Sequence, residues 1–443
     1  MARQFFGTDG VRGRVGEAPM TVEFALRLAS AAARVLAPRG GKVLIGKDTR
    51  LSGYMFEAAL EAGFVAAGVD VMLIGPLPTP GIAYLTRRFG CDFGVVISAS
   101  HNLYEDNGIK FFDADGAKLS DALEVQIEAE LQNPPLTQHS RALGRASRVD
   151  KSRSHYQEFC ASTLPAGVDL AGMKIVIDCA HGAGYKVAPR ILADLGAEIV
   201  PIGCSPNGRN INDGCGSTSP QLLQLTVPGV RAEVGIALDG DGDRLVMVDH
   251  FGRVLDGDQL LFIMATARHA DGVLRGPVVG TVMSNLGLEV ALREHGIGFQ
   301  RAQVGDRYVL GALRETGGEL GGETSGHILT LDKTTTGDAL VAALQVLAIM
   351  RRTGRTLELA APMSKFPQVM INVRVARRSD PLQVEAIATA ISAVEQRLGG
   401  EGRVVLRASG TEPVIRVMVE CRESADAKAC ATELAAVVTQ AMR

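Results

Sequence analysis

Three carboxylates stand close together in the stretch GIALDGDGDRLVMVD. An apolar run leads into Asp239, Asp241 and Asp243, which single glycines separate, and a second apolar run follows. Carboxylates this close repel one another unless a cation lies between them, so a hard divalent ion is their natural partner. The glycines permit the tight turn that brings alternate carboxylates inward. The pattern predicts a metal site on a loop between two buried strands.

Two alternatives compete with this metal site. An EF-hand also opens with D-x-D-x-D, but it needs glycine at its sixth position and glutamate at its twelfth. This chain has Arg244 and His250 there, so we exclude an EF-hand. A surface turn with three acidic residues and no metal remains an alternative, although the flanking buried strands would make three unpaired carboxylates energetically unfavourable.

A serine beside a histidine is the second candidate. In VVISASHNLYEDNGIKFF, strand-forming residues lead to Ser100 and His101, and a polar loop with Lys110 follows. The stretch does not match the G-x-S-x-G of a hydrolase nucleophile elbow. We expect the side chain of His101 to point away from Ser100, since neighbouring residues diverge on most backbones. A capping serine in a strand-to-helix loop is the structural alternative.

Polar loops near the C-terminus carry groups that bind sugars and phosphates. GGELGGETSGHILTLDKTTTGDAL offers alternating donors and acceptors at Glu323, Ser325 and His327, although glycine-rich loops are often plain turns. RASGTEPVIRVMVE combines arginines, hydroxyls and a glycine turn, which suits phosphate, with a solvated turn as the alternative. Its candidate residues are Arg407, Ser409, Gly410, Thr411 and Arg416.

Two further loops near the N-terminus are cationic. FFGTDGVRG places Arg12 after a glycine-rich turn, and GKDTRLSG contains Lys47, Asp48 and Arg50. Both loops adjoin predicted strands, where α/β sheets place their ligands. We expect these side chains to face a ligand.

The elements around these loops repeat. A buried strand, a turn, an amphipathic helix and a second strand recur in GKVLIGKDTR through VDVMLIG, in MKIVIDCAHGAG through AEIVPIG, and in GPVVGTVMSN through IGFQRAQVG. Each copy spans roughly 30 residues, the length of a βαβ unit. The repeats predict three similar mixed α/β sheet domains in series.

The tail after Phe366 differs, because three strands and two helices there predict a small α+β C-terminal domain. We place a linker at residues 133–147, which are polar and contain two prolines. The expected domains are 1–150 with the serine loop, 151–255 with the metal loop, 256–366 with the sugar loop and 367–443 with the phosphate loop.

Composition excludes several classes of protein. The chain has 443 residues, 46% hydrophobic and 21% charged, with a formal net charge of −3, which gives no reason to expect nucleic-acid binding. The apolar run from Ala339 to Met350 is too short to span a bilayer, and the N-terminus has no apolar signal segment. The 7 cysteines form no C-x-x-C pair, which favours reduced thiols in the cytoplasm.

Together these motifs combine a serine, a divalent-cation loop and several arginines, without a base–acid triad. Metal ions and arginines neutralise charge on a transferring phosphoryl group, which supplies most of the catalysis in phosphoryl transfer. The combination therefore predicts phosphoryl transfer to and from Ser100.

The chain resembles the α-D-phosphohexomutase superfamily in five ordered motifs: FFGTDGVRG, SASHN with DNGIKFF, DGDGDR, GGETSGH and RASGTEPVIRVM. The resemblance implies that Ser100 carries the phosphoryl group and binds one Mg²⁺ together with Asp239, Asp241 and Asp243. It also implies three α/β domains and a fourth that closes over the substrate phosphate, in a homodimer. Two positions depart from the family pattern: Leu103 replaces the usual proline, and Thr324 replaces glutamine or methionine.

Within the superfamily, TVMSNLGLE, VGDRYV and LDKTTTGDA are most similar to the phosphoglucosamine mutase branch. That branch interconverts glucosamine 6-phosphate and glucosamine 1-phosphate through glucosamine 1,6-bisphosphate, and feeds UDP-N-acetylglucosamine and cell-wall synthesis. Phosphomannomutase/phosphoglucomutase activity is one alternative, and a phosphosugar-binding protein without turnover is another.

The resemblance implies a role for each site residue. Lys110 and His327 move protons, in an order that stays open, and Arg12 stabilises the transferring phosphoryl group. Glu323 and Ser325 hold ring hydroxyls. The remaining substrate-binding residues are Arg244, Arg407, Ser409, Gly410, Thr411 and Arg416.

Overall fold

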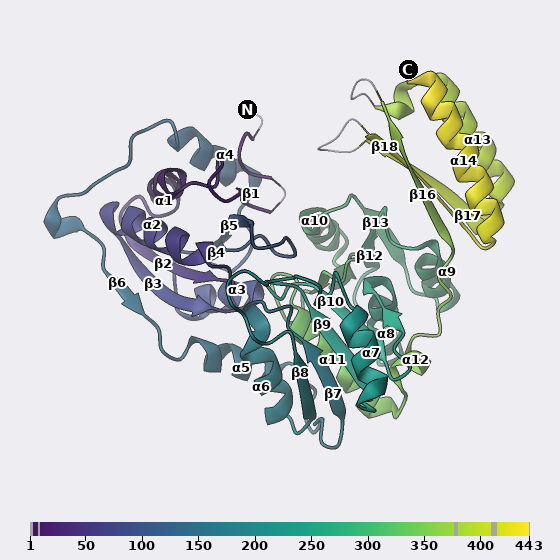
Figure 1. Cartoon of the computed structure of the whole chain (residues 1–443), viewed down its shortest axis with the longest axis horizontal. Helices are drawn as coiled ribbons and strands as arrows, with labels where there is room; N and C mark the ends of the chain where they lie inside the picture. Colours follow the sequence, from purple (N-terminus) through teal and green to yellow (C-terminus); the bar gives the residue numbers. More distant parts are fainter. Residues whose placement is uncertain (1–2, 8, 376–379, 409–413, 443) are drawn as a thin grey trace.

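The structure is a computed structural model that describes residues 3–7, 9–375, 380–408 and 414–442. Four sheets follow one another along the chain, and we call the parts that contain them domains 1 to 4 (Figure 1). Three mixed sheets with helices precede a small sheet covered by two helices, which confirms the predicted fold class. The boundaries at residues 150, 255 and 366 stay a prediction.

Domain 1 contains a six-stranded sheet of order β1-β5-β4-β2-β3-β6. The β1–β5 and β5–β4 pairings are antiparallel, and the other three are parallel. Its elements are β1 (Val11–Arg14), α1 (Val22–Leu36), β2 (Gly41–Lys47), α2 (Ser52–Ala66), β3 (Val69–Pro76), α3 (Thr79–Arg88), β4 (Phe93–Ile97), β5 (Asp106–Asp113), α4 (Asp121–Glu130), η1 (Ser140–Ala142) and β6 (Ala146–Arg148).

Domain 2 contains a five-stranded sheet of order β11-β10-β9-β7-β8. The β9–β7 and β7–β8 pairings are parallel, while β10 runs antiparallel to β9 and to β11. Its elements are α5 (Ser152–Ser162), β7 (Lys174–Asp178), η2 (Ala183–Tyr185), α6 (Val187–Asp194), β8 (Glu198–Ile202), α7 (Gln221–Gly229), β9 (Val234–Leu238), β10 (Leu245–Asp249) and β11 (Val254–Leu255).

Domain 3 contains a four-stranded sheet of order β13-β12-β14-β15. The first two pairings are parallel and β14–β15 is antiparallel. Its elements are α8 (Gly257–Ala270), β12 (Val278–Thr281), α9 (Leu286–Glu294), β13 (Phe299–Ala302), α10 (Asp306–Thr316), β14 (Leu320–Gly322), β15 (Ile328–Thr330), α11 (Ala339–Thr353) and α12 (Leu357–Ala360).

Domain 4 contains an antiparallel sheet of order β16-β18-β17, with α13 and α14 on one face (Figure 1). Its own core includes Val417, Val419 and Leu434, and is separate from the large core shared by domains 1 to 3. Its elements are β16 (Gln368–Arg374), η3 (Pro381–Gln383), α13 (Glu385–Leu398), η4 (Gly399–Glu401), β17 (Gly402–Ala408), β18 (Val414–Cys421) and α14 (Ser424–Ala441).

Domains 1, 2 and 3 each place one functional loop at the same point of the topology. The loops join β4 to β5, β9 to β10, and β14 to β15. In each domain the first strand of the pair is parallel to one neighbour and antiparallel to the strand that follows the loop. These loops contain Ser100, the three aspartates, and Glu323 with Ser325, so the repeated fold brings the three predicted motifs to one side of the molecule.

The predicted linker at residues 133–147 is wrong in part, because this segment packs on domain 1. The Gln138 amide donates to the Ala66 carbonyl at 2.8 Å, and the Gly144 amide donates to the Val65 carbonyl at 3.0 Å. The segment then enters β6, the edge strand of the first sheet. Backbone groups at the end of α2 therefore order a stretch whose polar composition suggested a free connection.

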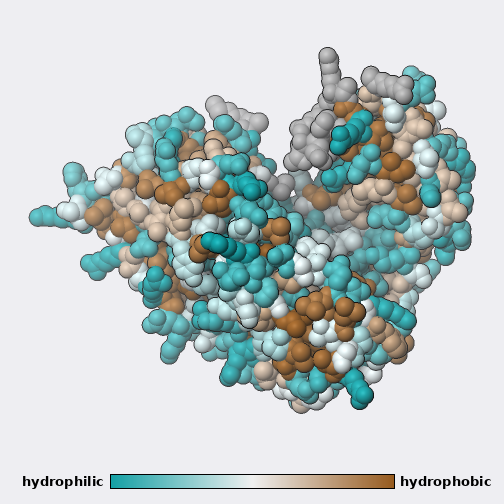
Figure 2. Space-filling model, in the orientation of Figure 1, coloured by the Kyte–Doolittle hydropathy of each residue, from teal (hydrophilic) through white to brown (hydrophobic). Residues whose placement is uncertain are grey.

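The polarity of the surface, the length of the helices and the state of the cysteines can be compared with what the composition predicted. Figure 2 shows polar residues over most of one face, with a hydrophobic patch over domain 2, where Leu222 and Leu225 of α7 are exposed. No helix in the described part of the chain combines the length and the apolarity needed to cross a membrane. All seven cysteines are described, and all are free thiols.

Candidate active site

Ser100 follows β4 and has a left-handed backbone conformation, with φ of 52°. Non-glycine residues rarely occupy this region, so surrounding contacts must hold it there. The Ser100 amide donates to Ser98 Oγ at 3.0 Å. Its carbonyl accepts from Arg50 Nη2 at 3.2 Å and from Asn212 Nδ2 at 2.9 Å. Domain 2, which supplies Asn212, therefore helps to fix the loop that carries Ser100.

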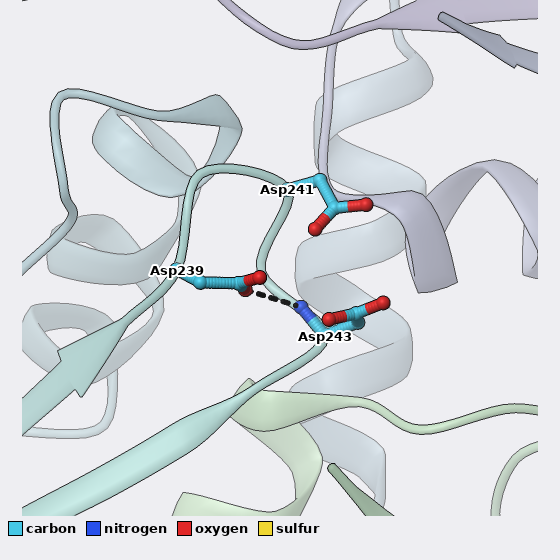
Figure 3. A group of neighbouring side chains, drawn as sticks. All are labelled: Asp239, Asp241 and Asp243. Atoms are coloured by element: carbon cyan, nitrogen blue, oxygen red, sulfur yellow. Dashed lines mark hydrogen bonds between the residues drawn. The ribbon is translucent and has the colours of Figure 1, made fainter. Parts of the chain in front are cut away.

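The side chain of Ser100 contacts the aspartate loop of domain 2. Its Oγ donates to Asp239 Oδ2 at 2.7 Å. Asp239, Asp241 and Asp243 are buried, and one carboxylate oxygen of each lies within 4.8 Å of the other two. Figure 3 shows the three side chains on one turn, where the Asp243 amide donates to Asp239 Oδ1 at 3.1 Å. The structure thus brings the predicted serine and the predicted metal ligands together.

The aspartate loop fits a divalent cation. Among the described residues, Asp241 Oδ1 and Asp243 Oδ1 are buried oxygens without a hydrogen-bond partner. Burial and the two neighbouring carboxylates raise the pKa of Asp239 well above its usual range, as expected for crowded acids. An added Cβ at Gly240 would stand 2.7 Å from the Ser100 carbonyl oxygen, so this turn requires glycine. The oxygen ligands match those that Mg²⁺ and Ca²⁺ prefer.

Lys110 and Arg12 supply positive charge from domain 1. Lys110 Nζ lies 2.7 Å from Asp241 Oδ2 and 2.9 Å from Asp9 Oδ2. Burial alone lowers the pKa of Lys110, but Asp241 and Asp9 raise it overall, so the amine is charged. Arg12 pairs with the same Asp9 carboxylate. Burial raises the pKa of Asp9, but Lys110, Lys118 and Arg12 lower it well below its usual range. Asp9 therefore anchors both predicted catalytic cations.

His327 supplies positive charge from domain 3. Its Nδ1 lies 3.7 Å from Asp243 Oδ2, and its Nε2 lies 3.5 Å from Asp306 Oδ2. Burial lowers the pKa of His327, but Asp243 and Asp306 raise it to about 9. The imidazole is therefore a cation at neutral pH and can donate a proton. The backbones of Arg244 and His327 pair in an isolated antiparallel β-bridge, which joins domain 2 to domain 3.

Part of this site lines a cavity of about 380 Å³, a volume suited to a small ligand such as a phosphosugar, while Asp239, Asp241 and Lys110 lie behind its wall. Domains 1, 2 and 3 all contribute to its wall, which includes Ser100, Arg12, Arg244, Glu323 and His327. Glu323 Oε1 accepts from the Gly305 amide at 2.9 Å. Ser325 is exposed and lies outside the cavity lining, so the structure does not bring this predicted sugar ligand to the site.

The predicted phosphate-binding residues of domain 4 are not assembled with the others. Arg407 on β17 lies directly opposite Arg416 on β18, and both are partly exposed. Neither lines the Ser100 cavity. Figure 2 shows the face hollowed between domain 1 and domain 4. The predicted ligands Ser409, Gly410 and Thr411 lie outside the described residues. Their role, with that of the two arginines, stays a prediction.

The expectation that His101 points away from Ser100 is wrong for this backbone. The left-handed turn at Ser100 places His101 Nδ1 3.4 Å from Ser100 Oγ. Burial, together with Arg244 and Arg12, lowers the pKa of His101 to about 4, so its ring is neutral at pH 7. The contact from Ser100 Oγ to His101 is longer than the hydrogen bond that Ser100 Oγ donates to Asp239 at 2.7 Å.

The expectation that Lys47, Asp48 and Arg50 face a ligand is also wrong. Arg50 is 0% exposed and pairs with Asp48, while Lys47 is 2% exposed and pairs with Glu57. A charge this deep must be paired inside the protein, and both are. Arg50 instead supports the serine loop by donating to the Ser100 carbonyl.

Sequence reasoning missed four residues of the site. Thr79 Oγ1 donates to Asp241 Oδ2 at 2.7 Å, and Asn212 holds the serine loop from domain 2. Asp9 anchors Arg12, and Asp306 contacts His327. Asp9 lies in FFGTDGVRG and Asp306 in VGDRYV, and both motifs also contain an arginine. An acidic residue close to an arginine in the same motif was the sequence signal that could have identified them. Thr79 and Asn212 had none.

The two departures from the family pattern differ in their surroundings. Thr324 Oγ1 donates to Asp258 Oδ2 at 3.0 Å, which turns this side chain toward Asp258. Leu103 is 50% exposed, and Arg50 and Asn212 hold the adjoining loop through backbone contacts. Whether Leu103 loosens that loop stays a prediction.

Comparisons with known proteins match the chain along most of its length. Four phosphoglucomutase/phosphomannomutase domains match in order: alpha/beta/alpha domain I over residues 3–137, domain II over 155–252, domain III over 256–366, and the C-terminal domain over 370–437. The chain is 58% identical over 443 residues to a phosphoglucosamine mutase of Thioalkalivibrio sulfidiphilus, covering 99% of this chain and 98% of that protein. It is 56% identical over 451 residues to one of Burkholderia mallei, covering 100% of both.

Solved structures show the same fold at lower identity. A phosphoglucomutase/phosphomannomutase family protein from Burkholderia thailandensis superposes with a TM-score of 0.82 at 23% identity, covering 98% of this chain and 97% of that chain. Aspergillus fumigatus N-acetylphosphoglucosamine mutase, in complex with GlcNAc-6P and magnesium, superposes with a TM-score of 0.70 at 18% identity, covering 100% and 96%. At these identities the likeness concerns the fold.

Proposed function

The chain belongs to the phosphoglucomutase/phosphomannomutase family, and we propose that it interconverts glucosamine 6-phosphate and glucosamine 1-phosphate. It is an isomerase of the phosphohexomutase type, and its full-length relatives at 56% and 58% identity are phosphoglucosamine mutases. One observation carries the proposal: Ser100 Oγ lies 2.7 Å from a buried three-carboxylate loop, at the wall of a cavity with cationic side chains.

Ser100 is the proposed phosphoryl carrier. Its phosphoserine form transfers the phosphoryl group to O1 of glucosamine 6-phosphate, so the P–Oγ bond breaks while a P–O1 bond forms. The resulting glucosamine 1,6-bisphosphate turns end for end. Its O6 phosphoryl group then returns to Ser100 Oγ and leaves glucosamine 1-phosphate. A sugar bisphosphate also serves as the activator that restores a dephosphorylated Ser100.

The other residues of the site would bind the metal, stabilise negative charge and transfer protons. Asp239, Asp241 and Asp243, with Ser100, would hold one Mg²⁺, which when bound neutralises charge on the transferring phosphoryl group. Arg12, which lines the same cavity, adds positive charge from domain 1. Lys110 and His327 both lie beside the carboxylates and are protonated in the resting site, so each can donate a proton to a leaving oxygen. The one that acts at the attacking hydroxyl must first lose its own proton, and it then accepts the proton that the hydroxyl releases.

The rest of the cavity and domain 4 would bind the sugar and its second phosphate. Glu323 is the proposed ligand of ring hydroxyls, with Arg244 beside it, and Ser325 would need to move to join them. The distal phosphate would bind the loop of domain 4, whose residues are Arg407, Ser409, Gly410, Thr411 and Arg416. Closure of domain 4 would bring this loop to the cavity and keep water from the phosphoserine.

Replacing Arg416 with methionine should lower kcat/KM for glucosamine 1-phosphate by roughly 10- to 100-fold, since a hydrogen bond to a charged group is worth about 1.5–3 kcal/mol. Binding energy from the distal phosphate positions the reacting end, so kcat should fall together with affinity. Steady-state kinetics provide the measurement. Arg422→Met is the matched control, because Arg422 is an exposed arginine of domain 4 paired with Glu401. Equal kcat/KM in the two variants would remove Arg416 from the phosphate site.

The enzyme should prefer glucosamine 1-phosphate over glucose 1-phosphate by roughly 10- to 100-fold in kcat/KM, since one charged amine contact is worth about 1.5–3 kcal/mol. Mannose 1-phosphate should be poorer still, because its axial 2-hydroxyl must fit in two orientations. Side-by-side kinetics on the three 1-phosphates, each with its matching bisphosphate, test this. A higher kcat/KM for mannose 1-phosphate would instead place the chain with the phosphomannomutases, the second candidate that the family name itself favours.

Several wider proposals follow from the same reaction. The product would feed UDP-N-acetylglucosamine and peptidoglycan precursors. Seven free thiols agree with the reducing conditions of the cytoplasm, where we place the enzyme. We also propose a homodimer that binds a phosphosugar and neither nucleic acid nor membrane. Absence of turnover on all three sugar phosphates would instead favour a binding protein.

A further inference from the structure

Lys118 joins two domains beside the Ser100 cavity. It follows β5, and its side chain is 13% exposed. Its ammonium pairs with a carboxylate oxygen of Asp9 in domain 1 and with one of Asp306 in domain 3. Burial lowers the pKa of Lys118, but the two carboxylates raise it overall, so the bridge is charged. Lys118 itself is not part of the cavity lining, so it acts on a ligand only through its partners.

Asp9 connects Lys118 to the cations of domain 1. One Asp9 oxygen faces Lys118, and the other pairs with Arg12 and lies 2.9 Å from Lys110 Nζ. Arg12 is assigned above to charge on the transferring phosphoryl group, and Lys110 to proton transfer at the oxygens bonded to it. Any shift of the Asp9 carboxylate would therefore move Arg12 and Lys110 together.

Asp306 connects Lys118 to the cation of domain 3. The Asp306 oxygen that receives Lys118 lies 3.5 Å from His327 Nε2, and His327 Nδ1 lies 3.7 Å from Asp243 Oδ2. Asp306 also begins α10 and lines the cavity. Charges of alternating sign thus run from Arg12 and Lys110, through Asp9, Lys118 and Asp306, to His327.

We propose that Lys118 is a positioning residue, which holds Arg12 and Lys110 of domain 1 and His327 of domain 3 at a fixed separation through Asp9 and Asp306. The proposal rests on the proposed phosphoryl transfer, because only that reaction requires all three cations at one phosphoryl group. Without Lys118, two partly buried carboxylates on different domains would repel each other across the boundary. The gap between the two sets of cations would then widen.

The test compares Lys118→Met with Lys118→Arg in the full-length enzyme, using kcat and KM for glucosamine 1-phosphate. Lys118→Met should lower kcat roughly 10- to 100-fold, the cost of a misplacement of about 1 Å, and change KM much less. Lys118→Arg keeps the charge and should recover most of kcat. A normal kcat in Lys118→Met overturns the proposal, and so does a loss confined to KM, which would indicate a binding residue.

A matched control separates Lys118 from any other contact between the domains. Arg307 of domain 3 pairs with Glu124 of domain 1, at 2.7 Å between Nη2 and Oε1, and is 20% exposed. Arg307→Met removes this ion pair and the one that Arg307 forms with Asp121, and it leaves the carboxylates of Asp9 and Asp306 in place. It should change kcat less than about threefold. A loss as large as that of Lys118→Met overturns the specific role of Lys118, because any interdomain ion pair would then suffice.

A double-mutant cycle keeps the proposal falsifiable if Lys118→Met fails to fold. Asp306→Asn removes one partner and the repulsion with Asp9, and should also lower kcat. Lys118→Met with Asp306→Asn removes both charges, so the double variant should fold and its loss should be smaller than the product of the single losses. A normal kcat in Asp306→Asn, or losses that multiply, overturns the proposal. A wild-type enzyme without turnover on glucosamine phosphate would instead refute the proposed function.

Discussion

Replacing Ser100 with alanine should remove the covalent phosphate and lower kcat by at least roughly 1,000-fold, as expected when a covalent nucleophile is lost. Ser100 Oγ lies 2.7 Å from Asp239 Oδ2 and is buried, so water is not a ready substitute at that position. Binding of the sugar should persist, because Glu323 and Arg244 line the same cavity independently of this hydroxyl. The variant should therefore bind glucosamine 1-phosphate and fail to isomerise it.

Intact mass and peptide mapping provide the measurement. Wild-type enzyme incubated with a sugar bisphosphate should carry one phosphoryl group, lost on phosphatase treatment and located in the peptide that contains residues 95–112. Ser120→Ala is the control, because Ser120 is a serine of the same domain that caps α4 through the Leu123 amide. It should keep both phosphate and turnover. Phosphate on that peptide in Ser100→Ala, with near-normal kcat, would show that another residue carries the group.

The repeated domains were accessible from sequence because their signals are local. Each βαβ unit is a buried strand, a glycine turn and an amphipathic helix within a short stretch, and the structure has all three. The hairpins that carry the functional loops were not accessible in the same way. The strands β4, β9 and β14 each gain an antiparallel neighbour after their loop, and that pairing depends on the whole sheet. Local patterns predicted the loops, and only the fold shows that they are topologically equivalent.

Charged residues show the limit of sequence reasoning more sharply. Arg50 and Lys110 both stand in polar motifs that were expected to be loops, yet Arg50 supports a backbone, while Lys110 lies within β5 and faces the carboxylate site. Their partners lie far along the chain, at separations of 50 residues for Arg50 to Ser100 and 131 for Lys110 to Asp241. Residue type and spacing alone do not show which of two charged residues will contact the site and which will support the backbone. The same holds for Asn212, which lies 112 residues from Ser100.

Domain 4 shows a different limit. Its strands and helices follow from sequence patterns that the structure confirms, and the structure adds that Arg407 and Arg416 face each other across β17 and β18. The proposed contact of these arginines with a substrate phosphate would depend on domain placement, because neither arginine lines the cavity. Polar contacts between domain 3 and domain 4, such as Asn285 Nδ2 to Glu420 Oε1 at 3.0 Å, set where domain 4 stands. Such a junction has no sequence motif of its own.

Asp241→Asn should weaken Mg²⁺ binding by roughly 100-fold and lower kcat in proportion at limiting metal, because affinity follows the charge of the oxygen ligands. Asparagine keeps the shape of the side chain, so Thr79 can still donate to the remaining oxygen, as it does to Asp241 Oδ2 at 2.7 Å. The change removes one of three clustered negative charges and places an N–H₂ group where an oxygen without a hydrogen-bond partner now stands. Loss of the ligand, and not loss of the fold, is therefore the expected effect.

Mg²⁺ titration followed by calorimetry and by thermal unfolding separates the two effects. A ligand that binds only the folded state stabilises it by about 2.7 kcal/mol at 100 times its dissociation constant, so wild-type enzyme should melt at a higher temperature as Mg²⁺ rises. Asp241→Asn should lose most of that shift, and its unfolding temperature without metal should stay near the wild-type value, since the relieved crowding of Asp239 and Asp243 offsets the lost ion pair with Lys110. Asp213→Asn, an exposed acid of the same domain, should behave as wild type. Full activity and an unchanged Mg²⁺ shift in Asp241→Asn would place the metal elsewhere, and full wild-type activity in excess chelator would remove it from the reaction.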